Sequence, residues 1–239
     1  MKKLYIKQTV STNALAWEMN REKELADGSL VYTDFQTDGK GQPGNTWESE
    51  NSRNLLFSMV LHPHHVPMDE LFLVSELVSI SIKKALDMHV HDITIKWPND
   101  IYWKDKKLAG ILIENSLQGN KIKTVVIGIG LNVNQKEFRS NAPNPVSLLQ
   151  ITHKRINRKQ LLQQICHNLM EMYAAFDKDT IQAEYASSLY RKEGFHSYRA
   201  GGVDFMAKIA EVHPDGQLIL EKENGERVGF YFKEVRFIL

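Results

Sequence analysis

The chain has 239 residues, 42% of them hydrophobic, enough to bury one large core or one core plus a small appended domain. Its 30 basic residues balance 29 acidic ones, and a net charge of +1 predicts neither nucleic-acid binding nor attraction to an anionic membrane. Lys7 and Gln8 interrupt any export signal at the start, and no later run approaches the roughly 20 apolar residues of a membrane span. We therefore expect a soluble cytoplasmic protein whose partners are small molecules or individual proteins.

Cysteine and histidine offer little chemistry. The single cysteine, Cys166, rules out an internal disulfide and a multi-cysteine zinc site. Its helical spacing from Leu162 and Leu169 favours a core thiol over a nucleophile. The histidines of segment 62–65 lie among prolines without a nearby cysteine or acid pair, so we expect a surface loop and no zinc site.

The first part of the chain alternates predicted strands and helices. Ser11-Thr12-Asn13 is a helix start that could cap its own first turn, Pro67 begins another helix that continues to Met88, and Asn157 caps a third that reaches Phe176. A further helix covers 180–190. The predicted strands are 30–33, 55–61, 94–96, 101–103, 107–114 and 123–128. Turns at 104–106 and 118–120 make consecutive hairpins, which favour a mixed or antiparallel sheet and an α+β fold.

The pattern changes after Gly194. Segments 204–212, 217–221 and 228–232 alternate apolar and polar residues, and turns at 214–216 and 224–225 separate them. About 45 residues of short strands bury little apolar area alone. We expect a small barrel that packs against the main domain.

Lys96-Trp97-Pro98-Asn99-Asp100 is the most informative stretch, because it is too polar for a core strand and too rich in special residues for an ordinary loop. Lys107 follows and leads into a buried strand that contains Gly110. A lysine in this position can neutralise a carboxylate and a developing phosphate charge together, as an acyl-adenylating enzyme requires. Read alone, residues 105–107 would be a charged hairpin tip.

Two glycine-rich segments add to this site. Segment 39–47 offers backbone N–H groups and Lys40 to anionic oxygens, although it has neither a P-loop nor a Rossmann pattern. In segment 128–134, Gly128 and Gly130 would let a flat ring lie against the chain, and Asn132 could bind an adenine edge or a phosphate. Read alone, the first is equally a mobile loop and the second a bulged strand end.

Together these segments resemble the biotin protein ligases over most of residues 11–134. Ser11-Thr12-Asn13 is similar to that family's biotin-contacting stretch, and Gln36 to its ureido-binding glutamine. The glycines and Trp47 of segment 39–47 match the family's Gly-Arg-Gly-Arg-x-Gly-x-x-Trp. Segments 96–100 and 107–110 match without a change, and 128–132 matches Gly-x-Gly-x-Asn.

The resemblance implies an ATP-dependent ligase that joins biotin to a lysine of a biotin carboxyl carrier protein, or an equivalent domain, through biotinyl-5′-adenylate. ATP and Mg²⁺ are the implied cofactors, no metal ligand is expected, and a homodimer is possible. Lys107 is the implied catalytic residue. The implied biotin-binding residues are Ser11, Thr12, Asn13, Gln36, Lys40, Gly41, Gln42, Lys107 and Gly110. The implied ATP- or adenylate-binding residues are Gly39, Lys40, Trp47, Lys96, Asn99, Asp100, Lys107 and Asn132, with Asp100 orienting either Lys107 or the attacking lysine.

By the same resemblance, residues 1–190 form a catalytic domain with a mixed sheet flanked by helices, and residues 191–239 an SH3-like domain. Because Ser11 lies close to Met1, we expect neither the N-terminal DNA-binding domain of some relatives nor specific DNA binding. Lys40 and Gln42 replace two family arginines, which removes bidentate guanidinium contacts. We expect Lys40 and loop N–H groups to retain the adenylate instead.

Two alternatives remain. A lipoate or octanoate ligase of the same superfamily is disfavoured by Gln36 and the intact Lys-Trp-Pro-Asn-Asp segment. A nucleic-acid-binding module with an SH3-like tail is disfavoured by the near-neutral charge and the lack of stacked aromatic residues.

Overall fold

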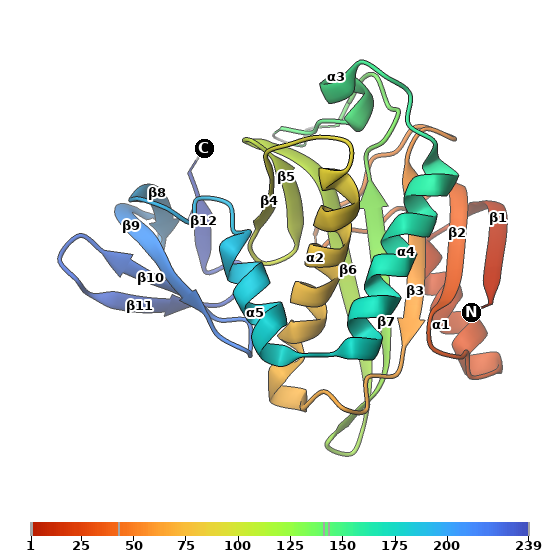
Figure 1. Cartoon of the computed structure of the whole chain (residues 1–239), viewed down its shortest axis with the longest axis horizontal. Coiled ribbons are helices and arrows are strands. Elements are labelled where there is room, and N and C mark those ends of the chain that lie inside the picture. Colours follow the sequence, from red (N-terminus) through yellow and green to blue (C-terminus); the bar gives the residue numbers. More distant parts are fainter. Residues whose placement is uncertain (1, 43, 141, 143, 239) are drawn as a thin grey trace.

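The apolar segments assemble into a mixed seven-stranded sheet in the computed structural model, which describes residues 2–42, 44–140, 142 and 144–238 (Figure 1). The strand order is β1-β2-β3-β7-β6-β5-β4. The bounds are β1 (Lys3–Thr9), β2 (Ser29–Gln36), β3 (Leu55–Leu61), β4 (Ile93–Lys96), β5 (Asp100–Trp103), β6 (Lys106–Gln118) and β7 (Lys121–Leu131). β1 and β2 are parallel, whereas the other neighbouring strands pair antiparallel, which confirms the predicted mixed sheet.

Helices cover both faces of this sheet, because side chains alternate along each strand. Val60 and Val126 pack with Ala16 of α1 on one face. Met59 and Ile127, their neighbours in the chain, belong to the larger core beneath α2 and α4 on the other face (Figure 1). The helices are α1 (Thr12–Glu22), α2 (Phe72–Asp87), α3 (Leu148–Thr152), α4 (Arg158–Ala175) and α5 (Lys178–Ser187), with a 3₁₀ turn at Met68–Glu70.

Three helix starts test the predicted caps. Asn157 caps α4 as expected, since its side-chain oxygen accepts from the backbone of Lys159 and Gln160. The side-chain cap expected at Ser11-Thr12-Asn13 is absent: Ser11 is the residue that precedes α1, and its side chain makes no capping hydrogen bond. Pro67 begins the 3₁₀ turn, and α2 itself starts only at Phe72.

The C-terminal strands form a second, five-stranded antiparallel sheet in the order β11-β10-β9-β8-β12. Its strands are β8 (His196–Ala200), β9 (Val203–Val212), β10 (Leu218–Lys222), β11 (Arg227–Phe230) and β12 (Val235–Phe237). Tyr198 and Leu220 are fully buried in the same hydrophobic cluster as the main core. Trp97 also donates its indole N–H to the carbonyl of Gly216, at 3.0 Å. The small sheet therefore packs against the main one as expected, while the boundary at residue 190 stays a prediction.

Within the described ranges, no helix has both the length and the apolar character needed to cross a bilayer.

Candidate active site

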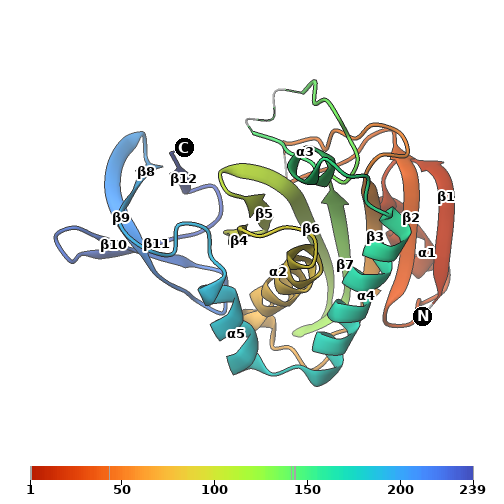
Figure 2. The same ribbon diagram turned by 45° about the horizontal axis from the view of Figure 1, so that its top comes forward.

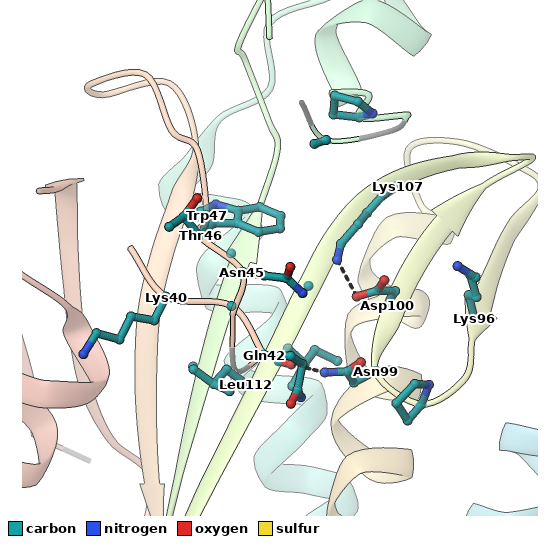
Figure 3. Close-up of a pocket in the computed structure, with 18 of the residues that line it drawn as sticks. Lys40, Gln42, Asn45, Thr46, Trp47, Lys96, Asn99, Asp100, Lys107 and Leu112 are labelled. Carbon is teal, nitrogen blue, oxygen red and sulfur yellow. Dashed lines mark hydrogen bonds and ion pairs between the residues drawn. The ribbon is translucent and has the colours of Figure 1, made fainter. Parts of the chain in front are cut away.

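A cleft of about 1090 Å³ is lined by the main sheet, segment 40–48 and the last residues of the C-terminal sheet (Figure 3). Figure 2 shows the ribbon of the C-terminal sheet beside β4 and β5 of the main sheet. The cleft brings together every predicted site residue except Gly39. These residues are Ser11, Thr12, Asn13, Gln36, Lys40, Gly41, Gln42, Trp47, Lys96, Asn99, Asp100, Lys107, Gly110 and Asn132. Segments up to 121 residues apart in the sequence thus share one site.

Lys107 and Asp100 form an ion pair in this cleft, with Lys107 Nζ 2.7 Å from Asp100 Oδ1 (Figure 3). They lie on the paired strands β6 and β5, and their side chains are 32% and 22% exposed. The backbone of Lys107 is fixed as well: its N–H donates to Asn144 O at 2.8 Å and its carbonyl accepts from Val146 N–H at 2.9 Å. The ammonium group is therefore held at a defined place beside a carboxylate.

Gly130 makes room for the ring of Trp47. A Cβ added at Gly130 would lie 2.4 Å from Trp47 Cε2, and one at Gly110 would lie 3.0 Å from Trp47 Cζ3. A Cβ added at Gly128 would lie 2.4 Å from Asn13 Oδ1. The sequence predicts that a ligand ring lies against Gly128 and Gly130, but the side chains of Asn13 and Trp47 fill that space. These glycines thus shape the cleft indirectly.

One end of the cleft holds a buried polar network around α1. Gln36 Oε1 accepts from the backbone N–H and hydroxyl of Thr12, at 2.7 and 3.0 Å. The hydroxyl of Ser58 lies 2.7 Å from Thr12 Oγ1 and 2.6 Å from Asn13 Oδ1. Asn13 Nδ2 donates to Glu114 Oε2 at 2.8 Å. Ser58 and Glu114 were not predicted, since only the register of β3 and β6 brings them to Asn13.

Segment 39–47 folds back on itself. Gly41 N–H donates to Asn45 O at 3.0 Å, Asn45 N–H to Gln42 O at 2.8 Å, and Trp47 N–H to Gly39 O at 2.8 Å. Three of the N–H groups expected to face anionic oxygens are therefore used within the loop. The remaining predicted residue, Gly39, lies outside the cleft lining, and a Cβ there would lie 2.8 Å from Trp47 O. Its role is to let the loop close.

Lys40 and Gln42 lie differently in the cleft. Lys40 is exposed, and its side chain extends away from Lys107 and Asp100 (Figure 3). Gln42 is half-buried and points toward the side of the cleft that carries Asn99 (Figure 3). The geometry therefore favours Gln42 over Lys40 as the side chain that faces a bound ligand.

Three polar atoms of the cleft lining lack partners. Asn132 Oδ1, Trp47 Nε1 and Asn144 Oδ1 are all buried and have no hydrogen-bond partner among the described residues. Because a buried polar atom without a partner costs free energy, such atoms are expected where a ligand completes the site. By contrast, Asn99 Nδ2 is already used, since it donates to the carbonyl of Ile111.

Lys96 lies at the border with the C-terminal sheet. Its ammonium donates to Tyr102 OH at 3.2 Å and lies 5.3 Å from the ring centroid of Phe237. Burial lowers the pKa of Lys96, and the nearby Asp100 carboxylate opposes that shift. Phe237 also lines the cleft, together with residues 232, 233, 235, 236 and 238. The sequence did not predict this contribution.

Cysteine and histidine lie elsewhere. Cys166 is buried in the main core, and burial raises its thiol pKa to about 12, which fits the predicted core thiol. The surface position expected for His62 is wrong: it is buried, with Nδ1 3.2 Å from Asp27 Oδ1. Within the described residues, no group of three or more His, Cys, Asp or Glu side chains is placed to hold a metal ion.

Comparisons with known proteins relate this chain to one family. Residues 5–132 match the model of the biotin/lipoate A/B protein ligase family. The bifunctional ligase/repressor BirA of Bacillus spizizenii is 31% identical over 159 residues, which are 65% of this chain and 48% of that protein. The biotin–[acetyl-CoA-carboxylase] ligase of Mycobacterium tuberculosis is 26% identical over 223 residues, covering 90% of this chain and 82% of that one. The chain thus spans about half the length of the Bacillus protein.

The fold has known counterparts too. The structure of the Aquifex aeolicus biotin protein ligase in complex with biotin and ATP superposes with a TM-score of 0.80 at 24% identity, over 99% of both chains. The likeness extends through the C-terminal sheet. Because the family model matches more than half of the sequence, the chain belongs to the biotin/lipoate A/B protein ligase family.

Proposed function

We propose that the protein is an ATP-dependent biotin–protein ligase. The observation that carries this proposal is that the Lys107–Asp100 ion pair shares one cleft with two chemically unlike groups of side chains. Thr12 and Gln36 form one end, with hydroxyl and amide groups suited to a small cyclic urea. Trp47 and Asn132 form the other, with an aromatic ring and an unpaired amide oxygen suited to a nucleotide.

The first step joins the two ligands. An oxygen of the biotin carboxylate attacks the α-phosphorus of ATP, pyrophosphate leaves, and biotinyl-5′-adenylate remains. Both reactants are anionic, so a cation between them lowers the barrier most effectively. Lys107 supplies this charge, and Asp100, 2.7 Å away, orients the ammonium group.

The second step transfers the biotinyl group. The ε-amine of a carrier lysine attacks the carbonyl carbon of the mixed anhydride, an amide bond forms, and AMP leaves. The proposed acceptor is a biotin carboxyl carrier protein or an equivalent domain, as the name of the mycobacterial relative suggests. The proposed location of the reaction is the cytoplasm.

Mg²⁺ enters this scheme with its substrate. Of the carboxylates in the cleft lining, Asp100 is paired with Lys107, and Glu48 accepts backbone hydrogen bonds from Arg139 and Ser140. Mg²⁺ is commonly bound by substrate phosphates, waters and only one or two carboxylates. We therefore propose that the ion arrives as the ATP complex and screens the phosphates.

The remaining side chains receive roles from their positions. Ser11, Thr12 and Gln36 would bind the ureido ring, and Asn13, whose amide is bonded to Ser58 and Glu114, would position them. Gly41, Gln42 and Gly110 would lie along the biotin chain. Lys96 and Asn99 would border the phosphates, Lys40 would stay exposed at the edge of the cleft, and Gly39 would act through the shape of the loop.

The test measures both steps with purified protein. Pyrophosphate release is followed with MgATP and biotin, lipoate or octanoate, first without an acceptor. A biotin carboxyl carrier domain, and its variant with the acceptor lysine replaced by arginine, are then added. We expect biotin-dependent pyrophosphate release and a streptavidin-reactive product only with the intact carrier. Release that depends on lipoate or octanoate, but not biotin, would assign the protein to the other branch of the family.

A further inference from the structure

Glu48 fastens two segments of the cleft wall together through backbone groups. Its Oε1 accepts from Arg139 N–H at 2.8 Å and from Gln135 Nε2 at 3.3 Å. Its Oε2 accepts from Ser140 N–H at 2.7 Å. Both carboxylate oxygens are therefore bonded to a segment about 90 residues further along the chain.

The segments joined in this way border the nucleotide end of the cleft. Glu48 directly follows Trp47, whose ring occupies the space above Gly130. Ser140 lines the same cleft. Gln135, only 1% exposed, strengthens the link, since its Oε1 accepts from Glu50 N–H at 3.0 Å and from Asn54 Nδ2 at 2.6 Å.

The contact is built for a charged carboxylate. Burial alone would raise the pKa of Glu48, but hydrogen bonds from Ser140, Arg139 and Gln135 outweigh that effect and hold the pKa below its usual value. Hydrogen bonds to an ionised acceptor are roughly twice as strong as those between neutral groups. An amide at this position would accept with only one of its two ends and would turn an N–H group toward a backbone donor.

We infer that Glu48 is a positioning residue for nucleotide binding, which holds Trp47 and the Arg139–Ser140 backbone together at one end of the cleft. This inference rests on the proposed function, because it takes the nucleotide to bind at the Trp47 and Asn132 end. The other end, around Thr12 and Gln36, has its own hydrogen bonds and does not depend on Glu48.

The experiment compares Glu48→Gln with the matched control Glu50→Gln. Glu50 lies in the same segment, but its side chain is 54% exposed and its carboxylate lies 3.8 Å from Arg53. Both variants remove one negative charge, and only the first loses the backbone contacts. Glu48→Asp keeps the charge on a shorter side chain. Dissociation constants for ATP and, separately, for biotin are measured by calorimetry, and amide hydrogen exchange is followed at Arg139 and Ser140.

Losing one charge-assisted hydrogen bond corresponds to about a 10-fold weaker Kd for ATP in Glu48→Gln. We expect its Kd for biotin to stay near that of the control and the exchange of Arg139 and Ser140 to accelerate. The Kd for ATP of Glu48→Asp should lie between those of the wild-type protein and Glu48→Gln. Equal ATP affinity in the Glu48→Gln and Glu50→Gln variants, or unchanged exchange, would overturn the inference.

A separate result would count against the proposed function alone. If the wild-type protein binds ATP and the Glu48→Gln variant weakens that binding, but no biotin-dependent pyrophosphate release occurs, Glu48 keeps its role and the reaction is wrong.

Discussion

Replacing Lys107 with alanine tests the proposed chemistry most directly. The change removes an ammonium group that lies 2.7 Å from Asp100 Oδ1 in the cleft. It also leaves the Asp100 carboxylate facing the place where two anionic ligands must meet. The variant therefore loses an attraction and gains a repulsion.

The size of the effect follows from the surroundings. Two unit charges 4 Å apart interact by about 4 kcal/mol at the effective dielectric constant of a protein surface. Because the Lys107 side chain is 32% exposed, water screens part of this interaction. We therefore expect the variant to lose about 3 kcal/mol of transition-state stabilisation, as is typical of preorganised charges. That loss slows adenylate formation about 100-fold.

The assay is single-turnover pyrophosphate release with biotin and MgATP and without a carrier, alongside circular dichroism to show that the fold is kept. Lys107→Arg keeps the charge with a different shape and should lie between wild type and Lys107→Ala. Replacing Asp100 with asparagine in the Lys107→Ala background should recover part of the rate, since it removes the repulsion. A Lys107→Ala rate within about 5-fold of wild type would refute the reasoning.

Three further predictions follow from other parts of the structure. Gly130→Ala places a Cβ 2.4 Å from Trp47 Cε2, so we expect a roughly 10-fold lower kcat/KM for ATP. Adding Trp47→Phe should recover part of this loss. An unchanged kcat/KM in Gly130→Ala would contradict the close packing of Trp47 on Gly130. In Figure 3 the Gln42 side chain points toward the side of the cleft that carries Asn99, whereas that of Lys40 extends away from Lys107 and Asp100. Gln42→Ala should therefore raise biotinylation of bystander albumin, measured on a streptavidin blot, more than Lys40→Ala does. The reverse order would support the expectation from the sequence that Lys40 retains the adenylate. Burial raises the pKa of Glu76 to about 8, above its ordinary value near 4.5, so the folded state binds the extra proton and stability falls as pH rises through this interval. Glu76→Gln should therefore raise the melting temperature more at pH 8 than at pH 5, and an equal shift at both would show that Glu76 does not titrate there.

The sequence predicted elements best where burial is complete. Residues 55–61 read as a buried strand, and β3 has these bounds because every residue of it is buried. β1 (Lys3–Thr9) was missed because it is an edge strand in which no residue is buried and whose lysines indicate a polar start. α3 was also missed, although Ser147 and Gln150 form a capping box that the sequence displays as Ser-x-x-Gln.

The proximity of site residues could be predicted from the sequence where these residues lie in one continuous segment. Lys107 and Asp100 lie on adjacent strands of a hairpin, so their proximity follows from local pairing. Ser58 and Phe237 could not be found in this way. Ser58 sits inside an apolar run, and only the packing of α1 on β3 brings it to Thr12; Phe237 reaches Lys96 from a different sheet.

The indole of Trp97 has a consequence for how the molecule unfolds. This side chain belongs to the Lys96–Asp100 segment, yet its N–H is bonded to Gly216 of the second sheet, and Tyr198 and Leu220 share the main core. Pulling the second sheet away would expose these apolar groups to water and leave the Trp97 donor without its partner. The two sheets should therefore melt in a single cooperative transition. A chain shortened to residues 1–190 would be expected to lose not only the second sheet but also the contacts that it makes with the Lys96–Asp100 segment.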